Sequence, residues 1–164
     1  MTEVTPEPPA DGLVDLILRH PRERKSKCSL EPLRGRPDLR FLTCRPDFQL
    51  PADGFLLLEV GAPVLTPADA GFPLLLLDST WRLLPKLQQV LTGTPRRRSL
   101  PPDVQTAYPR QSKLSPDPAD GLASVEALFL ARRLQGRSTS GLLEAYPWRN
   151  AFLRQFRDGK ENFS

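Results

Sequence analysis

Three short apolar runs, at residues 13–18, 55–60 and 74–77, dominate the hydrophobic pattern of the chain. Runs of this length that carry apolar residues toward both faces are typical of strands buried in a parallel sheet, so we expect an α/β fold. The third run is four consecutive leucines, and it ends abruptly at Asp78, three residues before Trp81. In open α/β sheets ligands bind beyond the carboxyl ends of the strands, which predicts a site containing these two residues. The same two residues also fit a helix cap and a core side chain.

Helical spacing predicts the remaining elements. Residues 66–69 have the form of a helix start, but a glycine and a proline soon after them limit that helix to about one turn. Leucines recur at helical spacing over residues 84–91. The clearest helix covers residues 121–134, and its apolar stripe comprises Val125, Leu128, Phe129, Leu130 and Leu134. A final short helix from about residue 141 leads to an aromatic anchor at residues 146–153.

Arginine dominates the basic residues of the chain, supplying 18 of 23, and the formal net charge is +4. Guanidinium groups pair bidentately with phosphate, so clustered arginines favour a nucleic-acid partner over a generic solvated surface. The clusters lie in two irregular segments, residues 19–27 and 28–40, and in a proline-rich loop at residues 92–121. We interpret that loop as a substrate-contacting segment rather than a linker. The side chains expected to bind RNA are Arg22, Arg24, Lys25, Lys27, Arg34, Arg36, Arg96, Arg97, Arg98 and Arg110.

Length and composition predict one domain, or one domain and a small lobe, with a disordered tail at residues 1–12. No run approaches the roughly 18 apolar residues of a membrane helix, and the acidic N-terminus does not resemble a secretory signal, so we expect a cytoplasmic protein. Cys28 and Cys44 lack a spacing suited to zinc, and His20 is the only histidine. This pattern argues against a protein-built metal site and against catalysis by a Cys/His or Ser/His/Asp set.

Several separate motifs of the chain resemble those of one enzyme family. Residues 78–81 (Asp-Ser-Thr-Trp), preceded by residues 65–69 (Leu-Thr-Pro-Ala-Asp), resemble the core motifs of the small-subunit rRNA aminocarboxypropyltransferases. The same four residues satisfy the D-x-T-W signature of the related DTW-domain tRNA-uridine aminocarboxypropyltransferases. Residues 122–127 resemble the L-S-T-x-E-A motif of the rRNA enzymes. Further resemblances lie at residues 27–29, 98–101, 107–109 and 146–153.

The resemblance implies a SPOUT-like α/β fold with a C-terminal trefoil knot. Residues 13–72 would be a small N-terminal α/β lobe, and residues 73–164 the region that binds S-adenosylmethionine. The implied reaction moves the 3-amino-3-carboxypropyl group of S-adenosylmethionine to a uridine or pseudouridine of rRNA or tRNA, and the implied enzyme is a monomer. The chain departs from the family in the short turn after residues 66–69, in the reduced segment around Tyr108 and at Ala123, which replaces a serine.

The resemblance also implies roles for individual residues. Trp81 would pack against the methyl group and the cationic sulfur of the donor, which leaves the γ-carbon in line with the nucleophile. Asp78 would orient or deprotonate the uridine imide, whereas Glu126 is expected to be structural. The other donor-binding residues would be Leu58, Val60, Leu100 and Leu122 around the adenine, and Ser29 and Ser124 at the carboxylate.

Two other functions fit the same sequence. The first is a ribosome assembly factor that binds RNA without catalysis, which the reduced segment around Tyr108 favours. The second is an S-adenosylmethionine-dependent RNA methyltransferase. The presence of Asp78 and Trp81 favours the aminocarboxypropyltransferase over the assembly factor. The mass added to RNA, a methyl or an aminocarboxypropyl group, would separate it from the methyltransferase.

Overall fold

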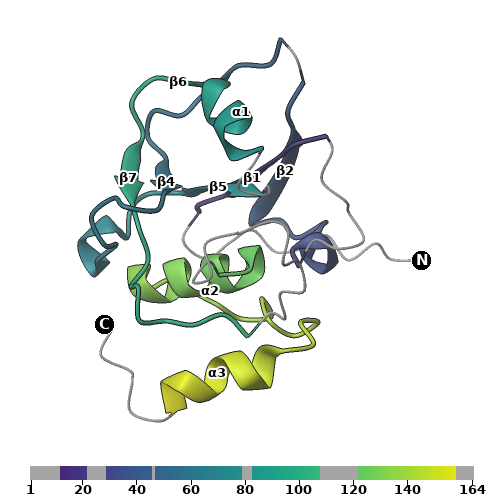
Figure 1. Cartoon of the computed structure of the whole chain (residues 1–164), viewed down its shortest axis with the longest axis vertical. Helices are drawn as coiled ribbons and strands as arrows, with labels where there is room; N and C mark the ends of the chain where they lie inside the picture. Colours follow the sequence, from purple (N-terminus) through teal and green to yellow (C-terminus); the bar gives the residue numbers. More distant parts are fainter. Residues whose placement is uncertain (1–11, 22–28, 46, 79–82, 108–121, 158–164) are drawn as a thin grey trace.

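The centre of the molecule is a five-stranded, wholly parallel sheet in the order β2-β1-β5-β4-β7 (Figure 1). The computed structural model describes residues 12–21, 29–45, 47–78, 83–107 and 122–157. The strands of the sheet are β1 (Asp15–Arg19), β2 (Leu39–Thr43), β4 (Leu56–Leu58), β5 (Leu74–Asp78) and β7 (Arg96–Arg98). A second parallel pair joins β3 (Leu50–Pro51) to β6 (Leu91–Thr92). The helices are α1 (Leu84–Gln89), α2 (Ser124–Gln135) and α3 (Arg149–Arg157), with 3-10 turns at Glu31–Leu33 (η2) and Pro67–Asp69 (η3).

Helices cover both faces of this sheet. Figure 1 shows α1 on one side, α2 on the other, and α3 beyond α2. Successive side chains of a strand point to opposite faces, so each strand contributes to two apolar cores. The first core joins α2 and α3 to Ile17, Leu56, Leu74 and Leu76. The second joins Leu87 of α1 to Leu16, Leu18, Leu57 and Leu75. Residues 16–18 of β1, 56–58 of β4 and 74–77 of β5 are therefore all apolar, which is why the sequence shows continuous runs.

The predicted α/β class and the three predicted strands are confirmed, as β1, β4 and β5. The helix predicted at residues 121–134 is confirmed as α2, with its whole apolar stripe buried. The sheet takes strands from both predicted regions, residues 13–72 and 73–164, because β1 lies between β2 and β5. The two regions therefore share one sheet and one set of cores.

The predicted loop at residues 92–121 is wrong at Arg96–Arg98, which form the edge strand β7. The Arg96 N–H donates to the Phe55 carbonyl at 2.9 Å, and the Glu59 N–H donates to the Arg98 carbonyl at 2.9 Å. Backbone pairing with β4 thus makes this strand without any apolar pattern. The other edge strand, β2, begins at Leu39, inside the segment predicted to be irregular, residues 28–40.

The helix predicted from about residue 141 begins instead at Arg149. Residues 141–145 form turns, and Pro147 has no N–H to continue a helix through that stretch. The aromatic anchor itself is present, since Phe152 is fully buried and packs edge-on against Phe129 at 6.1 Å between ring centroids. Leu91, predicted to be helical, lies in β6 because its neighbours pair with β3.

Three carboxyl groups with lowered pKa values make the fold sensitive to acid. Burial raises the pKa of Asp38, but hydrogen bonds from Arg36 and Arg132 outweigh it and hold this pKa well below its usual range. Burial likewise raises the pKa of Asp69, but hydrogen bonds from the Thr66 amide, Arg98 and Arg96 lower it overall. The hydrogen bond from Arg19 is the main cause that lowers the pKa of Glu31.

We expect the free energy of unfolding to fall when the pH drops below the ordinary carboxyl values of 3.8 and 4.5. A depressed folded-state pKa adds stability above the unfolded-state value, and that stability disappears as the pH falls toward the folded-state value. Urea unfolding at pH 7, 5, 4 and 3 measures this loss. Asp38→Asn is the control, because one of the linked groups no longer titrates and the loss should be shallower. An equally steep loss in the variant would contradict this assignment.

Candidate active site

The candidate site lies where the sheet changes its winding direction. From β1 the chain continues to β2 on one side, whereas from β5 it continues toward β7 on the other. Connections therefore diverge beyond the carboxyl ends of β1 and β5, which is where open α/β sheets hold their ligands. Arg19 and Asp78 are register partners at these two ends.

Asp78 is buried, with 5% of its surface exposed, and two elements hold its carboxylate. The Arg19 Nε donates to Asp78 Oδ2 at 3.2 Å. The Ser124 hydroxyl, from the first residue of α2, donates to Asp78 Oδ1 at 2.7 Å. Because both carboxylate oxygens accept hydrogen bonds from separate elements, this side chain is fixed in orientation as well as position.

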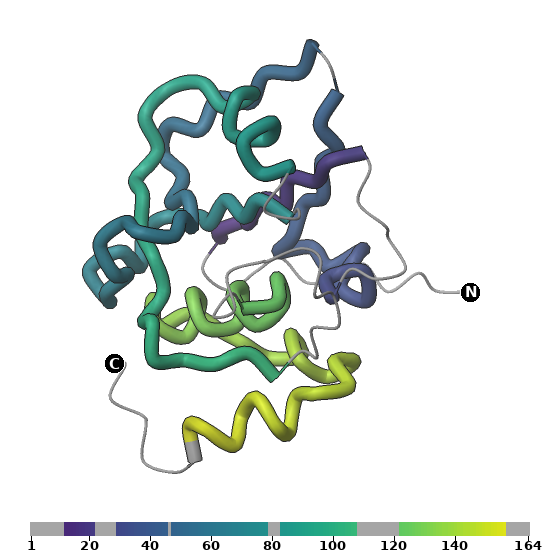
Figure 2. The backbone as a smooth tube through the Cα atoms, viewed as in Figure 1, coloured from purple at the N-terminus to yellow at the C-terminus, as the bar shows by residue number. Residues whose placement is uncertain are grey.

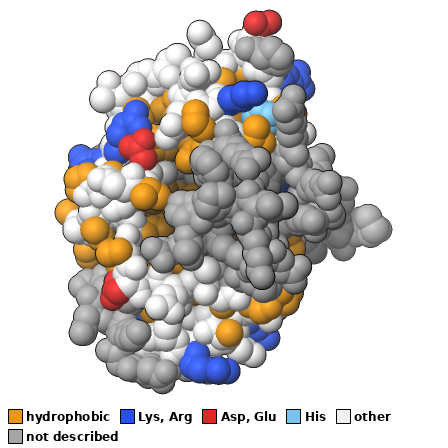
Figure 3. Space-filling model, in the orientation of Figure 1, with side chains coloured by type: hydrophobic (Ala, Val, Ile, Leu, Met, Phe, Trp, Pro, Cys, Tyr) orange, Lys and Arg blue, Asp and Glu red, His pale blue; other side chains and the backbone are white. Residues whose placement is uncertain are grey.

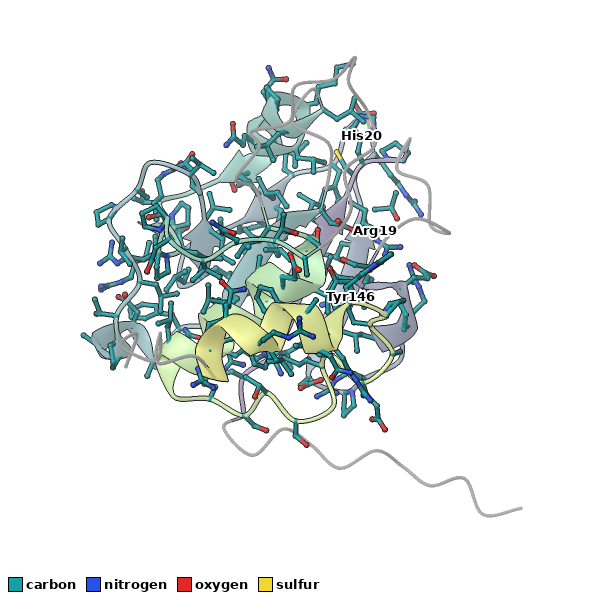
Figure 4. The ribbon with its side chains drawn as sticks, turned by 60° about the horizontal axis from the view of Figure 1, so that its bottom comes forward. Arg19, His20 and Tyr146 are labelled. Atoms are coloured by element: carbon teal, nitrogen blue, oxygen red, sulfur yellow. The ribbon has the colours of Figure 1, made fainter. Side chains whose placement is uncertain are left out.

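A polar cluster surrounds Arg19 on its other side. The Arg19 Nη1 donates to Glu31 Oε2 at 2.6 Å, and Glu31 Oε1 accepts from Arg34 Nε at 3.1 Å. The guanidinium groups of Arg19 and Arg34 lie 4.9 and 4.8 Å from the centroid of the Phe41 ring. Figure 4 labels Arg19 with His20, which follows it in the chain, and Tyr146. Ion pairing and stacking thus hold the Arg19 guanidinium against Asp78.

The start of α2 is held by a residue expected to bind the donor. The Val125 N–H donates to the Ser29 hydroxyl oxygen at 3.0 Å. The Ser29 hydroxyl hydrogen has no acceptor within the described part of the chain, so it is available to a carboxylate. The Ser124 hydroxyl, in contrast, already donates to Asp78. Ser29 can therefore donate a hydrogen bond to an amino acid carboxylate. That Ser29 and Ser124 bind S-adenosylmethionine stays a prediction.

The residues expected around an adenine end or follow β4, follow β7 or precede α2. Leu58, Leu100 and Leu122 are half-buried and pack against the core between the sheet and α2. Val60 differs, since 87% of its surface is exposed. Trp81, also expected to contact the donor, lies outside the described residues. Three of the four adenine-lining predictions thus fall on partly accessible apolar positions near the carboxyl end of the sheet.

The described arginines that were expected to bind RNA all form ion pairs. Arg96 and Arg98 both bind the buried Asp69, at 3.1 Å each, and Arg97 binds Glu59 at 3.0 Å. Arg34 and Arg36 pair with Glu31 and Asp38. The side chains of Arg34, Arg96 and Arg97 remain 45%, 40% and 49% exposed. On the face shown in Figure 3 the basic side chains are scattered rather than gathered in one patch. The other members of the set lie outside the described residues: Arg22, Arg24, Lys25, Lys27 and Arg110.

An open cavity of about 460 Å³ lies away from Asp78. Phe55 and Pro95 line it, and they directly precede β4 and β7, so it adjoins the amino ends of these strands. Phe72, Arg96 and Arg98 complete its wall, and the Arg96 guanidinium stacks on Phe72 at 4.3 Å. Asp78, Ser29 and Ser124 are not among the described residues that line this cavity.

Two searches for relatives returned nothing, since no family model and no curated protein matches the sequence. A search of solved structures returned the S-adenosylmethionine-dependent rRNA aminocarboxypropyl transferase Tsr3 of Vulcanisaeta distributa. The two structures agree with a TM-score of 0.66 over 92% of this chain and 83% of the other, at 20% sequence identity. The chain has the Tsr3 fold. Tsr3 carries the activity of the enzyme family that the motifs resemble, and the α/β class expected from that resemblance is confirmed.

Two further surveys concern the described residues alone. None of their helices combines the length and hydrophobicity of a membrane span. Their His, Cys, Asp and Glu side chains do not gather in groups of three that could hold a metal ion.

Sequence analysis missed Arg19 as a site residue. It ends a buried strand as Asp78 does, and that position was the available signal. Glu126 was expected to be structural, and the structure places it in a hydrogen-bond cluster with Thr106 and Tyr146.

Proposed function

We propose that this protein transfers the 3-amino-3-carboxypropyl group of S-adenosylmethionine to a uridine or pseudouridine of RNA. The observation that carries the proposal is the buried Asp78 at the carboxyl end of β5, held by Arg19 and Ser124 where the sheet changes direction. The likeness to Tsr3 supports the same reaction, with rRNA as the favoured target over tRNA. A C-terminal trefoil knot, a cytoplasmic location and a monomeric state are further parts of this proposal.

In this reaction the ring nitrogen of the target base forms a bond to the γ-carbon of the donor. The bond between that carbon and the sulfonium sulfur breaks, and methylthioadenosine leaves. The protein must favour the γ-carbon over the methyl carbon by orientation, the role proposed for Trp81. Ser29 would hold the donor carboxylate, while Leu58, Leu100 and Leu122 would contact the adenine.

Asp78 would orient the target base and accept its ring proton. Its two oxygens accept hydrogen bonds from Arg19 and Ser124, so the direction of the carboxylate is fixed. A uridine imide N–H directed at this carboxylate would be fixed in line with the γ-carbon. The carboxylate would accept the ring proton as the bond between the ring nitrogen and the γ-carbon forms.

Incubation of the protein with S-adenosylmethionine labelled in its carboxyl carbon, and with RNA lacking the modification, tests this function. Label should enter the RNA, and nucleoside mass spectrometry should find an added aminocarboxypropyl group. Methyl label in RNA without carboxyl label would show a methyltransferase instead. RNA binding without transfer of either label would show a non-catalytic assembly factor.

A further inference from the structure

Glu126 is a fully buried carboxylate that accepts four hydrogen bonds. Its Oε1 accepts from the Ala123 N–H at 2.8 Å and from the Thr106 hydroxyl at 2.6 Å. Its Oε2 accepts from the Ala107 N–H at 2.9 Å and from the Tyr146 hydroxyl at 3.0 Å. These four donors are neutral, so hydrogen bonds rather than a counter-charge stabilise the carboxylate.

The four donors come from three segments that are distant in the sequence. Ala123 immediately precedes α2, and Tyr146 precedes α3. Thr106 and Ala107 end the segment that leaves β7 and runs past α2 toward α3, as Figure 2 shows. Glu126 therefore fixes the start of α2 against the segments that lead from β7 and toward α3.

The start of α2 is also the part of the helix that reaches the candidate site. Ser124, the residue after Ala123, donates to Asp78, and the Val125 N–H donates to Ser29. Leu122, expected to contact the adenine, directly precedes Ala123. Any shift of this first turn would move Ser124, which holds Asp78, and Leu122, which is expected to contact S-adenosylmethionine.

We propose that Glu126 is the positioning residue of the site, acting through Ala123 and Ser124 to keep the start of α2 in register with Asp78 and the donor. This inference rests on the proposed function. A polar group with every bond satisfied in a low-dielectric interior is rigid, and such rigidity keeps neighbouring ligands within binding geometry.

Glu126→Gln is the direct variant, because it keeps the size of the side chain and replaces one acceptor oxygen by an NH2 group. We expect the dissociation constant for S-adenosylmethionine, measured by calorimetry, to rise about tenfold. In the absence of S-adenosylmethionine, hydrogen exchange of the backbone amides of this variant should be faster over residues 122–127 and 104–107. Tyr146→Phe removes one hydrogen-bond donor to Glu126 and should raise the dissociation constant for S-adenosylmethionine by roughly threefold.

Gln155→Ala is the matched control. Gln155 of α3 holds the segment from β7 by two hydrogen bonds to the Gln105 backbone, at 3.0 and 2.9 Å, and none of its hydrogen bonds within the described residues reaches the start of α2. This variant should speed exchange only over residues 104–107 and change donor affinity by less than about twofold. An equal loss of affinity in Gln155→Ala and Glu126→Gln would overturn the inference, because general loosening would explain both.

Hydrogen exchange distinguishes a failure of this inference from a failure of the proposed function. Unchanged exchange over residues 122–127 in Glu126→Gln would overturn the positioning role itself, whatever the protein binds. Failure of the unaltered protein to bind S-adenosylmethionine would instead overturn the proposed function. Faster exchange together with weaker donor binding in Glu126→Gln, beside normal binding in Gln155→Ala, supports both.

Discussion

Asp78→Asn should lower the rate of aminocarboxypropyl transfer to RNA by roughly 10²- to 10⁴-fold, the range for removing a positioned proton acceptor. Asparagine has nearly the same shape, but its NH2 group cannot accept a hydrogen bond. Arg19 and Ser124 both donate hydrogen bonds to Asp78, so one of them would then face the NH2 group, which is itself a hydrogen-bond donor. Single-turnover transfer of carboxyl-labelled donor, with RNA in excess, measures the rate without the contribution of product release.

Asp38→Asn is the matched control for this experiment. Asp38 is also a buried carboxylate paired with arginines, but it precedes β2, at the amino end of the sheet. Its replacement should leave the transfer rate within a few fold of the original. RNA affinity should be unchanged in Asp78→Asn, because Asp78 holds none of the arginines expected to bind phosphate. Near-normal transfer by Asp78→Asn would show that another group orients the target base.

The strands at the centre of the sheet could be predicted because burial on both faces leaves a continuous apolar run. Leu74, Leu75 and Leu76 face two different cores, and that requirement is visible in the sequence. The edge strands carry no such requirement. Arg96–Arg98 extend because the backbone pairs with β4 and because Asp69 and Glu59 neutralise the guanidinium groups. Those contacts are long-range, so no local pattern predicts the strand.

The candidate site could likewise be predicted only in part from the sequence. Asp78 could be predicted because it ends the central apolar run. Its partner Arg19 lies 59 residues away, and the two meet only because β1 and β5 are neighbours in the sheet. Strand order cannot be deduced from the apolar pattern, since each buried run fits any central position. The contact between Ser29 and Val125, 96 residues apart, depends on how α2 packs against the sheet.

Arg132→Ala should lower the free energy of unfolding by about 3–5 kcal/mol, the usual cost of removing one partner from a buried ion pair. Arg132 is 3% exposed and binds two carboxylates, through Nε to Asp15 at 2.8 Å and through Nη1 to Asp38 at 2.7 Å. Burial lowers the pKa of this guanidinium, but Asp15 and Asp38 raise it overall. Urea unfolding at pH 7 measures the loss, which is a large share of the 5–15 kcal/mol typical of a domain.

Arg133→Ala is the control in the same helix, because Arg133 is exposed and stacks on Phe156 at 5.4 Å. Its loss should cost no more than about 1 kcal/mol. Arg132→Ala leaves Asp15 with Arg137 and Asp38 with Arg36, so each buried carboxylate loses one of two cations. Arg132→Met removes the same charge but keeps a long side chain. If the lost counter-charge sets the cost, Arg132→Met should be about as unstable as Arg132→Ala in the same urea unfolding. Near-normal stability of Arg132→Met would show instead that packing of the long Arg132 side chain, rather than its charge, holds α2 to the sheet.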